Sequence, residues 1–448
     1  MSSNLSRRQF LKSAGVASAG ALAFPALLRS QEGQAPVNKL NVACIGVGGR
    51  AKSGSIEGLK GENFVAFADV DDENAADTYK KFPDVPRYRD YRKLLDEHGK
   101  DIDAVAITTP DHMHFPIAMA ALQLGKHVFC EKPLTHTIWE ARTLAQLARE
   151  KKVATQMGNQ GHASEGIRLL KEWIDAGVLG EVREVHSWTD RPGKIWPQGG
   201  LKLPDHSKFI PVVPPTLDWD TWLGVAQPRA YDPAYLPFTW RGYWDFGTGA
   251  LGDMGCHLLD GAHWALQLDA PTHIEAVRAL DNHLTGPSAS MITFQFPARG
   301  SLAPVTLKWY DGGLIPPPPA ALEANRQLPD NGTLFVGSKA TALATLYNQS
   351  VRIIPETKMQ ELAPTLPPKT LPRVAGGHFA EWIRACKGGP AAGSNFDVAS
   401  RLTELCLLSN VAVRARRPLE WDAAAMRVTN VPEANQYLTK EYRPGFGV

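Results

Sequence analysis

A glycine-rich turn directly after a short apolar run is the feature that most constrains the fold of this chain. The run 40–45 leads into the turn 46–51, which reads Gly-Val-Gly-Gly-Arg-Ala and fits the pattern Gly-x-Gly-x-x-Ala. A strand that ends in such a turn and opens a helix can hold a pyrophosphate against backbone N–H groups, where the helix dipole favours negative charge. The turn therefore predicts dinucleotide contacts from Gly46, Val47, Gly48, Gly49, Arg50 and Ala51.

A second apolar run supports this interpretation, because it ends in an acidic residue. Residues 64–68 are apolar and are followed by Asp69. A carboxylate about 20 positions beyond the glycines is where dinucleotide-binding domains accept hydrogen bonds from the adenosine ribose. A glycine-rich turn alone is a weak signal, but the turn and Asp69 together indicate a dinucleotide-binding domain.

The pattern along the first third of the chain predicts the architecture of that domain. Apolar runs at 103–107, 126–130 and 153–157 alternate with helical patterns. Alternation of strands and helices favours a parallel sheet covered on both faces. We therefore predict an α/β chain with a doubly wound Rossmann domain over residues 36–155. The helical patterns lie at 72–81, 89–98, 112–124 and 136–150.

After this domain the pattern changes to strands that follow one another directly. Such succession favours an antiparallel or mixed sheet. We expect residues 156–448 to form a C-terminal α+β domain with an open, largely antiparallel or mixed sheet, interrupted by the Pro-, Gly- and Trp-rich stretch 190–247. The strand patterns lie at 182–188, 273–280, 290–296, 303–310, 332–336, 340–346 and 350–354, and the helical patterns at 161–177, 252–267, 377–387 and 397–415.

The N-terminus carries the pattern of a twin-arginine export signal. Residues 6–12 read Ser-Arg-Arg-Gln-Phe-Leu-Lys, an Ala- and Gly-rich apolar stretch follows, and residues 21–23 offer a cleavage site. The apolar stretch is too short for a permanent membrane anchor. We expect residues 1–31 to engage the twin-arginine export machinery and the protein to be periplasmic or otherwise exported. Because this route carries folded proteins and free dinucleotide is scarce outside the inner membrane, we expect a tightly bound cofactor.

Composition narrows the remaining classes of function. The formal net charge is +2 and no basic run occurs, so nothing supports nucleic-acid binding. The five cysteines form no CxxC pair and lie in apolar or helical contexts, which indicates buried free thiols rather than a disulfide framework. They are Cys44, Cys130, Cys256, Cys386 and Cys406.

Polar residues follow two of the predicted parallel strands at the point where each strand ends. The segment 108–114 reads Thr-Thr-Pro-Asp-His-Met-His, and Glu131-Lys132-Pro133 follows the next strand. Ligands of open parallel sheets bind beyond the carboxyl ends of the strands. We therefore expect both segments at the cofactor crevice, with Lys132 donating a hydrogen bond to an oxygen that undergoes redox change. An ordinary surface lysine is the alternative interpretation.

A second constellation lies in the predicted helix 252–267. Asp253 and His257 are four residues apart, so they share one helical face. A histidine near its free pKa is the usual general base at neutral pH, and a carboxylate beside it would fix its orientation. Two other interpretations stay open. Asp253 can cap the helix while His257 lies in the core, or the two can bind a metal, although no third ligand is spaced nearby.

These motifs together resemble the Gfo/Idh/MocA oxidoreductase family, over nearly the whole mature chain. The resemblance implies a nicotinamide cofactor, hydride transfer to or from a ring carbon of a sugar or polyol, and a homodimer or homotetramer. It implies that Lys132 contacts the reacting oxygen, and that Asp253 and His257 are the catalytic pair. Asp69 favours NAD over NADP because its charge would repel a 2′-phosphate, although Arg50 could favour that phosphate. Further cofactor contacts are expected from Thr109, Pro110, His114, Glu131 and Asn159.

The substrate contacts are less well defined by the family pattern. The segment 158–162 replaces a more aromatic or Arg-rich segment of better-known members, and the stretch 190–247 adds aromatic and charged residues that suit stacking on sugar rings. A packed loop explains the tryptophans equally well. Expected substrate contacts are Gln160, His162, Trp188, Arg191, Arg241, Tyr243 and Trp244.

The sequence therefore predicts an exported NAD(H)-dependent oxidoreductase that acts on a ring CH–OH or ketone of a sugar, glycoside or polyol. Two alternatives keep the cofactor permanently bound: redox-neutral glycoside cleavage by oxidation, elimination and reduction, and aldose–ketose exchange. A third is an NAD-binding sensor without catalysis, against which Lys132, Asp253 and His257 argue together.

Overall fold

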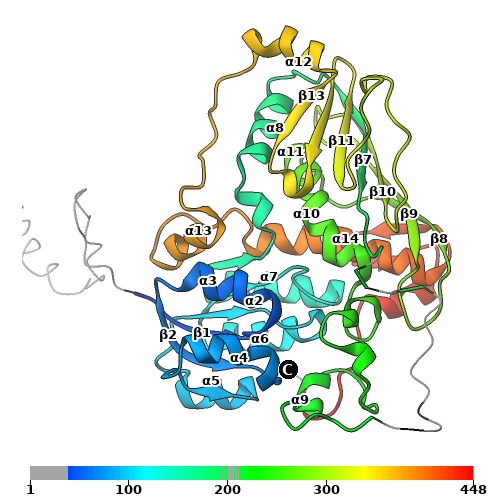
Figure 1. The fold of residues 1–448 in the computed structure, drawn as a ribbon. Helices are drawn as coiled ribbons and strands as arrows, with labels where there is room; N and C mark the ends of the chain where they lie inside the picture. Colours follow the sequence, from blue (N-terminus) through cyan, green and yellow to red (C-terminus); the bar gives the residue numbers. More distant parts are fainter. Residues whose placement is uncertain are drawn as a thin grey trace, which may run out of the picture. The chain divides into compact units, whose positions relative to one another are not determined.

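The computed structural model describes residues 39–446, apart from 194, 197, 200–205, 207, 208 and 210. The predicted export signal, residues 1–31, lies outside the described residues. From Leu40 onward the chain forms one unit with two sheets (Figure 1).

The first sheet has six parallel strands in the order β3-β2-β1-β4-β5-β6. The order reverses between β1 and β4, and open α/β sheets bind ligands at such a switch point. This confirms the predicted Rossmann domain, and only β3 lacks a counterpart among the predicted strands. The strands are β1 (Asn41–Ile45), β2 (Asn63–Ala68), β3 (Arg87–Tyr88), β4 (Ala104–Ile107), β5 (His127–Cys130) and β6 (Thr155–Met157).

Helices cover both faces of this sheet, because alternate strand residues point to opposite sides. Val42 and Cys44 of β1 pack in one buried cluster with α2, α3 and α4, whereas Ala43 and Ile45 pack in the other with α5, α6 and α7. The helices are α2 (Gly49–Ser53), α3 (Ser55–Leu59), α4 (Asp72–Lys81), α5 (Tyr91–His98), α6 (His114–Gln123) and α7 (Ile138–Lys151).

A helix from the far end of the chain completes one of these layers. In α13 (Gly377–Cys386), Phe379 stacks on Phe129 of β5 at 4.7 Å between ring centroids, and Trp382 meets the same ring at 5.7 Å. The last strand of the sheet, β6, straddles the predicted boundary at residue 155. The division into domains at that residue stays a prediction, because later segments pack on the first sheet.

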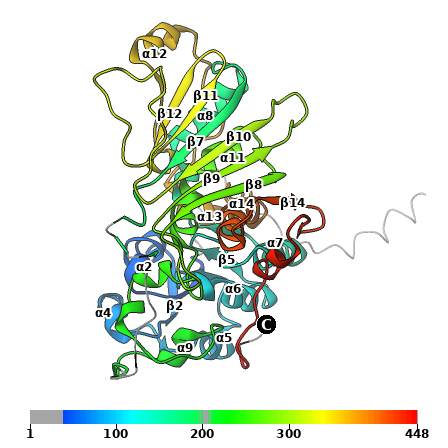
Figure 2. The ribbon, with the colours of Figure 1, turned by 90° about the vertical axis from the view of Figure 1, so that its right-hand side faces the viewer.

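The second sheet is mixed and has nine strands in the order β13-β12-β11-β7-β10-β9-β8-β14-β15 (Figure 2). β7 and β10 are parallel and the other pairs are antiparallel, which confirms the predicted mixed sheet. The strands are β7 (Val182–Trp188), β8 (His273–Ala279), β9 (Ala289–Phe296), β10 (Val305–Tyr310), β11 (Gly332–Gly337), β12 (Thr341–Thr345), β13 (Val351–Ile354), β14 (Leu419–Asp422) and β15 (Arg427–Val428).

Helices α8 (Glu165–Asp175) and α14 (Phe396–Ala415) connect the two sheets, and α14 packs against both α7 and β8. The predicted helix 252–267 is broken. It consists of a π-helical turn (Leu251–Gly255), α10 (Cys256–Leu258) and α11 (Asp260–Ala265). No sequence pattern predicted α12 (Glu356–Leu362) or the hairpin β14–β15.

The Trp-rich stretch contains a small aromatic module of its own, residues 214–246, which we call the aromatic segment. It includes α9 (Trp219–Leu223), and its buried side chains form a separate cluster. Backbone hydrogen bonds join it to the loop after β2: Asp72 N–H donates to Thr216 O at 3.0 Å, and Asp218 N–H donates to Val70 O at 2.8 Å. The aromatic segment is thereby fixed next to the carboxyl end of β2.

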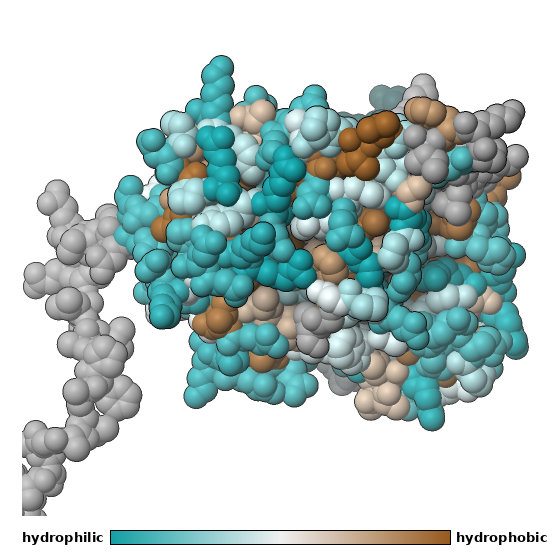
Figure 3. Space-filling model, turned by 90° about the horizontal axis from the view of Figure 1, so that it is seen from below, coloured by the Kyte–Doolittle hydropathy of each residue, from teal (hydrophilic) through white to brown (hydrophobic). Residues whose placement is uncertain are grey.

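None of the helices in the described part of the chain is long and apolar enough to cross a membrane. The face seen from below is mostly hydrophilic, with scattered hydrophobic side chains (Figure 3).

Candidate active site

A cleft of about 680 Å³ lies at the carboxyl ends of the parallel strands, and the aromatic segment forms part of its wall. Fourteen of the residues that the sequence assigns to a site line this cleft. They are Gly46, Gly48, Gly49, Arg50, Asp69, Thr109, Pro110, Glu131, Lys132, Gln160, Arg191, Arg241, Asp253 and His257.

The glycine turn fits the role of a phosphate-binding loop. Gly46 has φ +76° and packs closely on the end of the neighbouring strand β4. A Cβ added at Gly46 would lie 2.5 Å from Thr108 O. An added Cβ at Gly48 would collide with the side chain of Asn74. Gly49 has φ +44° and open space on its cleft side. The first two glycines therefore allow close packing, and the third leaves room for a ligand at the backbone.

Asp69 ties the end of β2 to this turn. Its Oδ2 accepts hydrogen bonds from the N–H groups of Val47 and Gly48 at 2.8 and 3.0 Å, and its Oδ1 accepts one from Asp71 at 3.0 Å. Burial raises the pKa of Asp69, and these backbone N–H groups oppose that shift in part. The carboxylate lines the cleft at the place where a ribose is expected.

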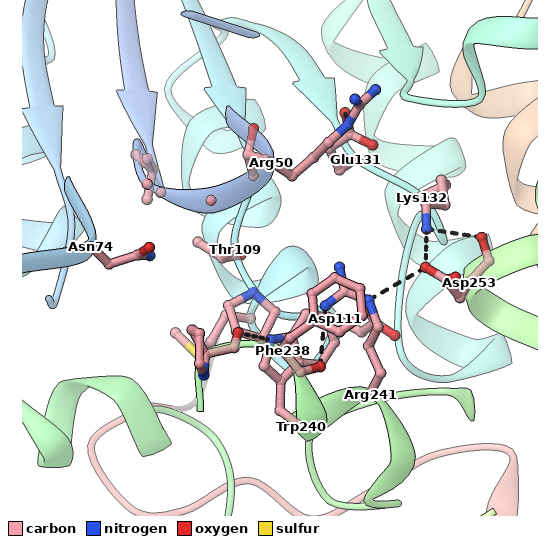
Figure 4. Close-up of a pocket in the computed structure, with 18 of the residues that line it drawn as sticks. Arg50, Asn74, Thr109, Asp111, Glu131, Lys132, Phe238, Trp240, Arg241 and Asp253 are labelled. Atoms are coloured by element: carbon pink, nitrogen blue, oxygen red, sulfur yellow. Dashed lines mark hydrogen bonds and ion pairs between the residues drawn. The ribbon is translucent and has the colours of Figure 1, made fainter. Parts of the chain in front are cut away.

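Arg50 lies at the other side of the turn, beside β5 (Figure 4). Its Nε is 3.6 Å from Glu131 Oε1, which also accepts a hydrogen bond from Gln160 Nε2 at 3.1 Å. The second oxygen, Glu131 Oε2, is buried without a hydrogen-bond partner among the described residues. Arg50 is thus engaged at the end of β5 and not at Asp69.

Lys132 and Asp253 meet across the cleft, as Figure 4 shows. Lys132 Nζ donates to Asp253 Oδ1 at 2.6 Å and to the Asp253 backbone O at 2.8 Å. Arg241 Nε donates to the same carboxylate oxygen at 3.3 Å. Although burial alone would raise the pKa of Asp253, the two cations hold it well below its ordinary value. Asp253 is therefore an ionised carboxylate that binds Lys132 and Arg241.

His257 lines the cleft beside this pair, and its imidazole is neutral. Burial lowers the pKa of His257 well below its ordinary value, and the charge of Lys132 lowers it further. Nδ1 is buried and has no hydrogen-bond partner in the described part of the chain. The predicted orientation of His257 by Asp253 has no hydrogen bond to support it, because Asp253 is bonded to the two cations instead.

Four residues predicted to contact the cofactor lie behind the cleft wall. Val47 supports the turn through Asp69, and Ala51 is buried under it. His114 places both ring nitrogens against carbonyl oxygens, Pro133 O at 2.7 Å and Thr109 O at 2.9 Å. Asn159 is fully buried, where it donates to Asp260 Oδ2 at 3.1 Å and accepts from Ser394.

Four residues predicted to contact the substrate also lie away from the cleft. His162 Nδ1 is bonded to Asp260 at 2.9 Å, and that carboxylate raises the pKa of His162 against the opposing effect of burial. Trp188 fills the core of the second sheet and donates to Pro329 O at 2.7 Å. Tyr243 packs inside the aromatic segment, and Trp244 lines a separate cavity of about 240 Å³.

The cleft also contains side chains that sequence reasoning missed. Two of them are Phe238 and Trp240, whose ring centroids lie 3.9 and 4.3 Å from the guanidinium of the predicted residue Arg241. Asp111 lines the cleft and accepts a hydrogen bond from Thr248 Oγ1 at 2.6 Å. Asp71 and Asn74 follow the end of β2 closely in the sequence, which could have indicated them, whereas no local pattern marks Tyr347. Further lining residues are Asp71, Asn74, Trp222, Tyr347 and Gln349.

All five cysteines are free, four of them buried and Cys386 half-buried. Among the described residues, no three His, Cys, Asp or Glu side chains are grouped so that they could hold a metal ion.

Comparison with protein-family models gives matches over nearly the whole chain. Residues 40–159 match the model described as "Oxidoreductase family, NAD-binding Rossmann fold", and residues 166–448 match "Oxidoreductase family, C-terminal alpha/beta domain"; both are Gfo/Idh/MocA models. Residues 4–24 match the signal sequence of the twin-arginine translocation pathway, so the chain carries a signal for export by that route.

Individual relatives are distant. The chain is 27% identical over 199 residues to levoglucosan dehydrogenase of Pseudarthrobacter phenanthrenivorans, covering 44% of this chain and 41% of the relative. It is 32% identical over 130 residues to inositol 2-dehydrogenase of Salmonella typhimurium, covering 29% and 38%. The matches thus span less than half of these relatives' length.

Solved structures show the same fold. The WlbA dehydrogenase of Bordetella pertussis, in complex with NADH and UDP-GlcNAcA, has a TM-score of 0.59 at 15% identity, covering 86% of this chain and 99% of that one. Levoglucosan dehydrogenase with NADH and levoglucosan has a TM-score of 0.55 at 18% identity, covering 85% and 99%.

Proposed function

The chain belongs to the Gfo/Idh/MocA oxidoreductase family, and on this premise we propose that it is an NAD(H)-dependent oxidoreductase acting on a CH–OH group or ketone of a sugar, glycoside or polyol. One observation carries the proposal. Lys132, from the end of a parallel strand, and His257, from the second half of the chain, line the same cleft as the glycine turn. A reacting carbon and a nicotinamide can therefore share one site with both side chains.

The residues present fit a dinucleotide. The open backbone at Gly49 would face the pyrophosphate, and Asp69 would accept hydrogen bonds from the adenosine ribose. Asp71 also lines this end of the cleft, so two carboxylates would repel a 2′-phosphate. Arg50 lies beside Glu131 instead, with its Nε 3.6 Å from Glu131 Oε1. These contacts favour NAD over NADP.

Lys132 is the group that binds the reacting oxygen. A lysine ammonium has three N–H donors, and two of them are taken by Asp253. The third is left for a substrate hydroxyl or carbonyl. Because Asp253 remains ionised, it fixes the direction of that donor. Stabilising negative charge on an oxygen in this way is the usual contribution of a preorganised donor.

His257 is the group that moves the proton. Its neutral imidazole can take the hydroxyl proton on a ring nitrogen during oxidation, and return it during reduction. A bound nicotinamide would supply the hydride acceptor in the first direction and the hydride donor in the second. The Lys132 charge beside His257 also keeps the imidazole from being protonated before the substrate arrives.

The aromatic segment supports tight retention of the nucleotide. It lines the cleft through Trp222, Phe238 and Trp240 and is hydrogen-bonded to the loop after β2. The C-terminal tail anchors it further, because Arg443 Nε donates to Gly224 O at 2.9 Å. A nucleotide under this segment would leave only after the segment had moved. Such retention suits an exported enzyme, and it also keeps redox-neutral cleavage and aldose–ketose exchange open.

A substrate panel tests the proposal. The protein is purified with its nucleotide and mixed with sugars, polyols and aryl glycosides, with and without added NAD, while nicotinamide absorbance and products are followed. Net oxidation predicts a ketone product and accumulation of reduced nicotinamide. Redox-neutral cleavage predicts release of the aglycone without added NAD. A nucleotide that binds but reacts with no compound would instead favour the sensor alternative.

A further inference from the structure

The orientation of the His257 imidazole is not set by Asp253. The Asp253 carboxylate is bonded to Lys132 and Arg241, and Nδ1 of His257 has no hydrogen-bond partner among the described residues. A general base must be held in a fixed geometry to be effective. Some other group has to hold this ring.

The ring of Tyr347 is in contact with the imidazole. The two ring centroids are 4.4 Å apart and the planes meet at 65°, which is an edge-to-face arrangement. Such pairs are favourable beyond the apolar area that they bury. The neighbouring residue acts on the backbone of the same histidine, because Asn348 Nδ2 donates to His257 O at 2.7 Å. Two consecutive residues thus hold both the ring and the main chain of His257.

The backbone of these two residues is in a sparsely populated conformation. Tyr347 has φ +60° and Asn348 has φ +52°. Asparagine tolerates the left-handed region, whereas a bulky residue such as tyrosine adopts it only where the surroundings impose it. Strain of this kind is concentrated at active sites and ligand clamps. Both residues belong to the 346–349 turn, which joins β12 to β13 at the edge of the nine-stranded sheet.

Three glycines show how the surroundings impose this conformation. Cβ atoms added at Gly161 and Gly166 would collide with the backbone oxygens of Tyr347 and Asn348. A Cβ added at Gly261 would lie 2.5 Å from Asn348 Oδ1. Two hydrogen bonds fix the same turn: Ser164 Oγ donates to Asn348 O at 2.8 Å, and the Gly166 N–H donates to Gln349 O at 3.1 Å. The turn is therefore embedded between α8 and α11 rather than free at the sheet edge.

We propose that Tyr347 is a positioning residue, whose ring is held by the 346–349 turn and fixes the imidazole of His257 in its working orientation. This rests on the proposed function, because it assumes that His257 moves the proton. The ring of Tyr347 carries the effect, and its hydroxyl does not. Tyr347 also lines the cleft, so it shields the imidazole from water.

Two variants separate the ring from the hydroxyl. Tyr347→Phe keeps the ring, and we expect kcat to stay within about twofold. Tyr347→Leu keeps bulk but loses the aromatic edge, and we expect kcat to fall between about 10- and 100-fold, with little change in the KM for nucleotide. Tyr437→Leu is the matched control, because that tyrosine lines the separate cavity and not the cleft. Equal losses in the Phe and Leu variants, or none in either, would overturn the proposal.

A second readout needs no catalysis. Histidine signals of the resting protein are titrated by NMR, with the His257 signal assigned from its loss in His257→Gln. The charged and titratable groups acting on this imidazole are Lys132, Asp253, Arg50 and His378, and all are unchanged in Tyr347→Leu. We expect the His257 pKa to rise in Tyr347→Leu, as water reaches the ring, and to stay in place in Tyr347→Phe. An unchanged titration in Tyr347→Leu would contradict the positioning role even if no substrate were found, whereas a shifted titration without turnover would contradict only the proposed function.

Discussion

The two halves of the cleft are built in different ways. The nucleotide half comes from one stretch of chain, which runs from the turn 46–51 to the loop after β2, and it offers the open backbone at Gly49 and the carboxylate of Asp69. The reacting half is assembled from side chains that are far apart in sequence. Lys132, Arg241, Asp253 and Tyr347 each come from a different element.

The nucleotide half therefore serves to bind the cofactor, and the reacting half serves the chemical step. The glycine turn and Asp69 are expected to bind the pyrophosphate and adenosine parts of the dinucleotide, which do not react, and few local residues suffice to specify such contacts. The reacting half instead needs charges of opposite sign held close together in a buried place, which only tertiary packing can supply. Lys132 and Arg241 compensate Asp253 there, and His257 stays neutral beside them. Substitutions in one half should therefore leave the function of the other half largely intact.

Lys132→Ala should have the largest effect and should be confined to the reacting half. Loss of a preorganised donor costs about 10²–10³ in kcat, and we expect the upper end because the ammonium charge is lost as well. The Kd for NAD, measured by calorimetry, should stay within about threefold. Lys151→Ala, which removes an exposed lysine whose Nζ donates to Gln123 O, is the control. A Lys132→Ala enzyme that turns over normally would end this assignment.

The pH dependence of oxidation should reveal the neutral histidine. The ordinary pKa of a histidine is near 6.5, and that of His257 is well below it. The imidazole therefore stays able to accept a proton as the pH falls through 6.5, and the acid limb of kcat should lie below that value. Since Lys132 is one cause of the low pKa, Lys132→Ala should move the acid limb of its residual activity to higher pH. An acid limb at or above 6.5 in the unmodified enzyme would contradict a buried neutral base.

Asp69→Ala should weaken the binding of NAD and leave kcat largely unchanged, because Asp69 belongs to the nucleotide half. Hydrogen bonds to a charged group are worth about 1.5–3 kcal/mol, so the Kd for NAD should rise by about 10- to 100-fold. At saturating NAD, kcat should change by less than about twofold. Discrimination against NADP should narrow, because one repelling carboxylate is gone. Asp77→Asn serves as control, because it changes an exposed carboxylate of α4 that is paired with Lys52 of α2. Equal losses in kcat and in affinity would show that the halves are not separable.

The smallest effect should come from the anchor of the aromatic segment. Arg443→Ala removes the hydrogen bonds from the C-terminal tail to Gly224 and Asp220. Loss of such bonds costs about 1–3 kcal/mol. We expect part of this free energy to destabilise the aromatic segment in its position over the cleft. We expect release of reduced nicotinamide to accelerate about 3- to 10-fold, as measured by displacement in stopped-flow fluorescence. A release rate that does not change would remove the aromatic segment from the account of cofactor retention.

The contrast between the halves also explains how far the sequence alone could lead. The position of the turn 46–51, Asp69 and Lys132 at the cleft was predictable, because each is marked by a local pattern at a strand end. Trp188 and Trp244 were not, because an aromatic side chain gives the same local signal whether it stacks on a sugar or fills a core. Single-sequence patterns do not report which of these environments the fold supplies.

Pairings between residues that are distant in the sequence account for the remaining differences between the predicted site and the site in the structure. Asn159 and His162 are turned away from the cleft by Asp260, which lies about 100 residues further along the chain. The π-helical turn at 251–255 sends Asp253 to Lys132, although the spacing from His257 indicated a shared helical face. Tyr347 had no local signal, because its position depends on three glycines elsewhere in the chain, Gly161, Gly166 and Gly261.

A double-mutant cycle on Lys132 and His257 tests the central claim most directly, that both side chains act on one reacting oxygen. The rate of nicotinamide reduction is measured for Lys132→Ala, His257→Gln and the double variant, each loaded with NAD. Residues that act as a unit are strongly non-additive, so the double variant should be no more than about tenfold slower than the slower single variant. Losses that multiply, with each substitution retaining its full effect in the presence of the other, would mean that the two side chains serve separate sites.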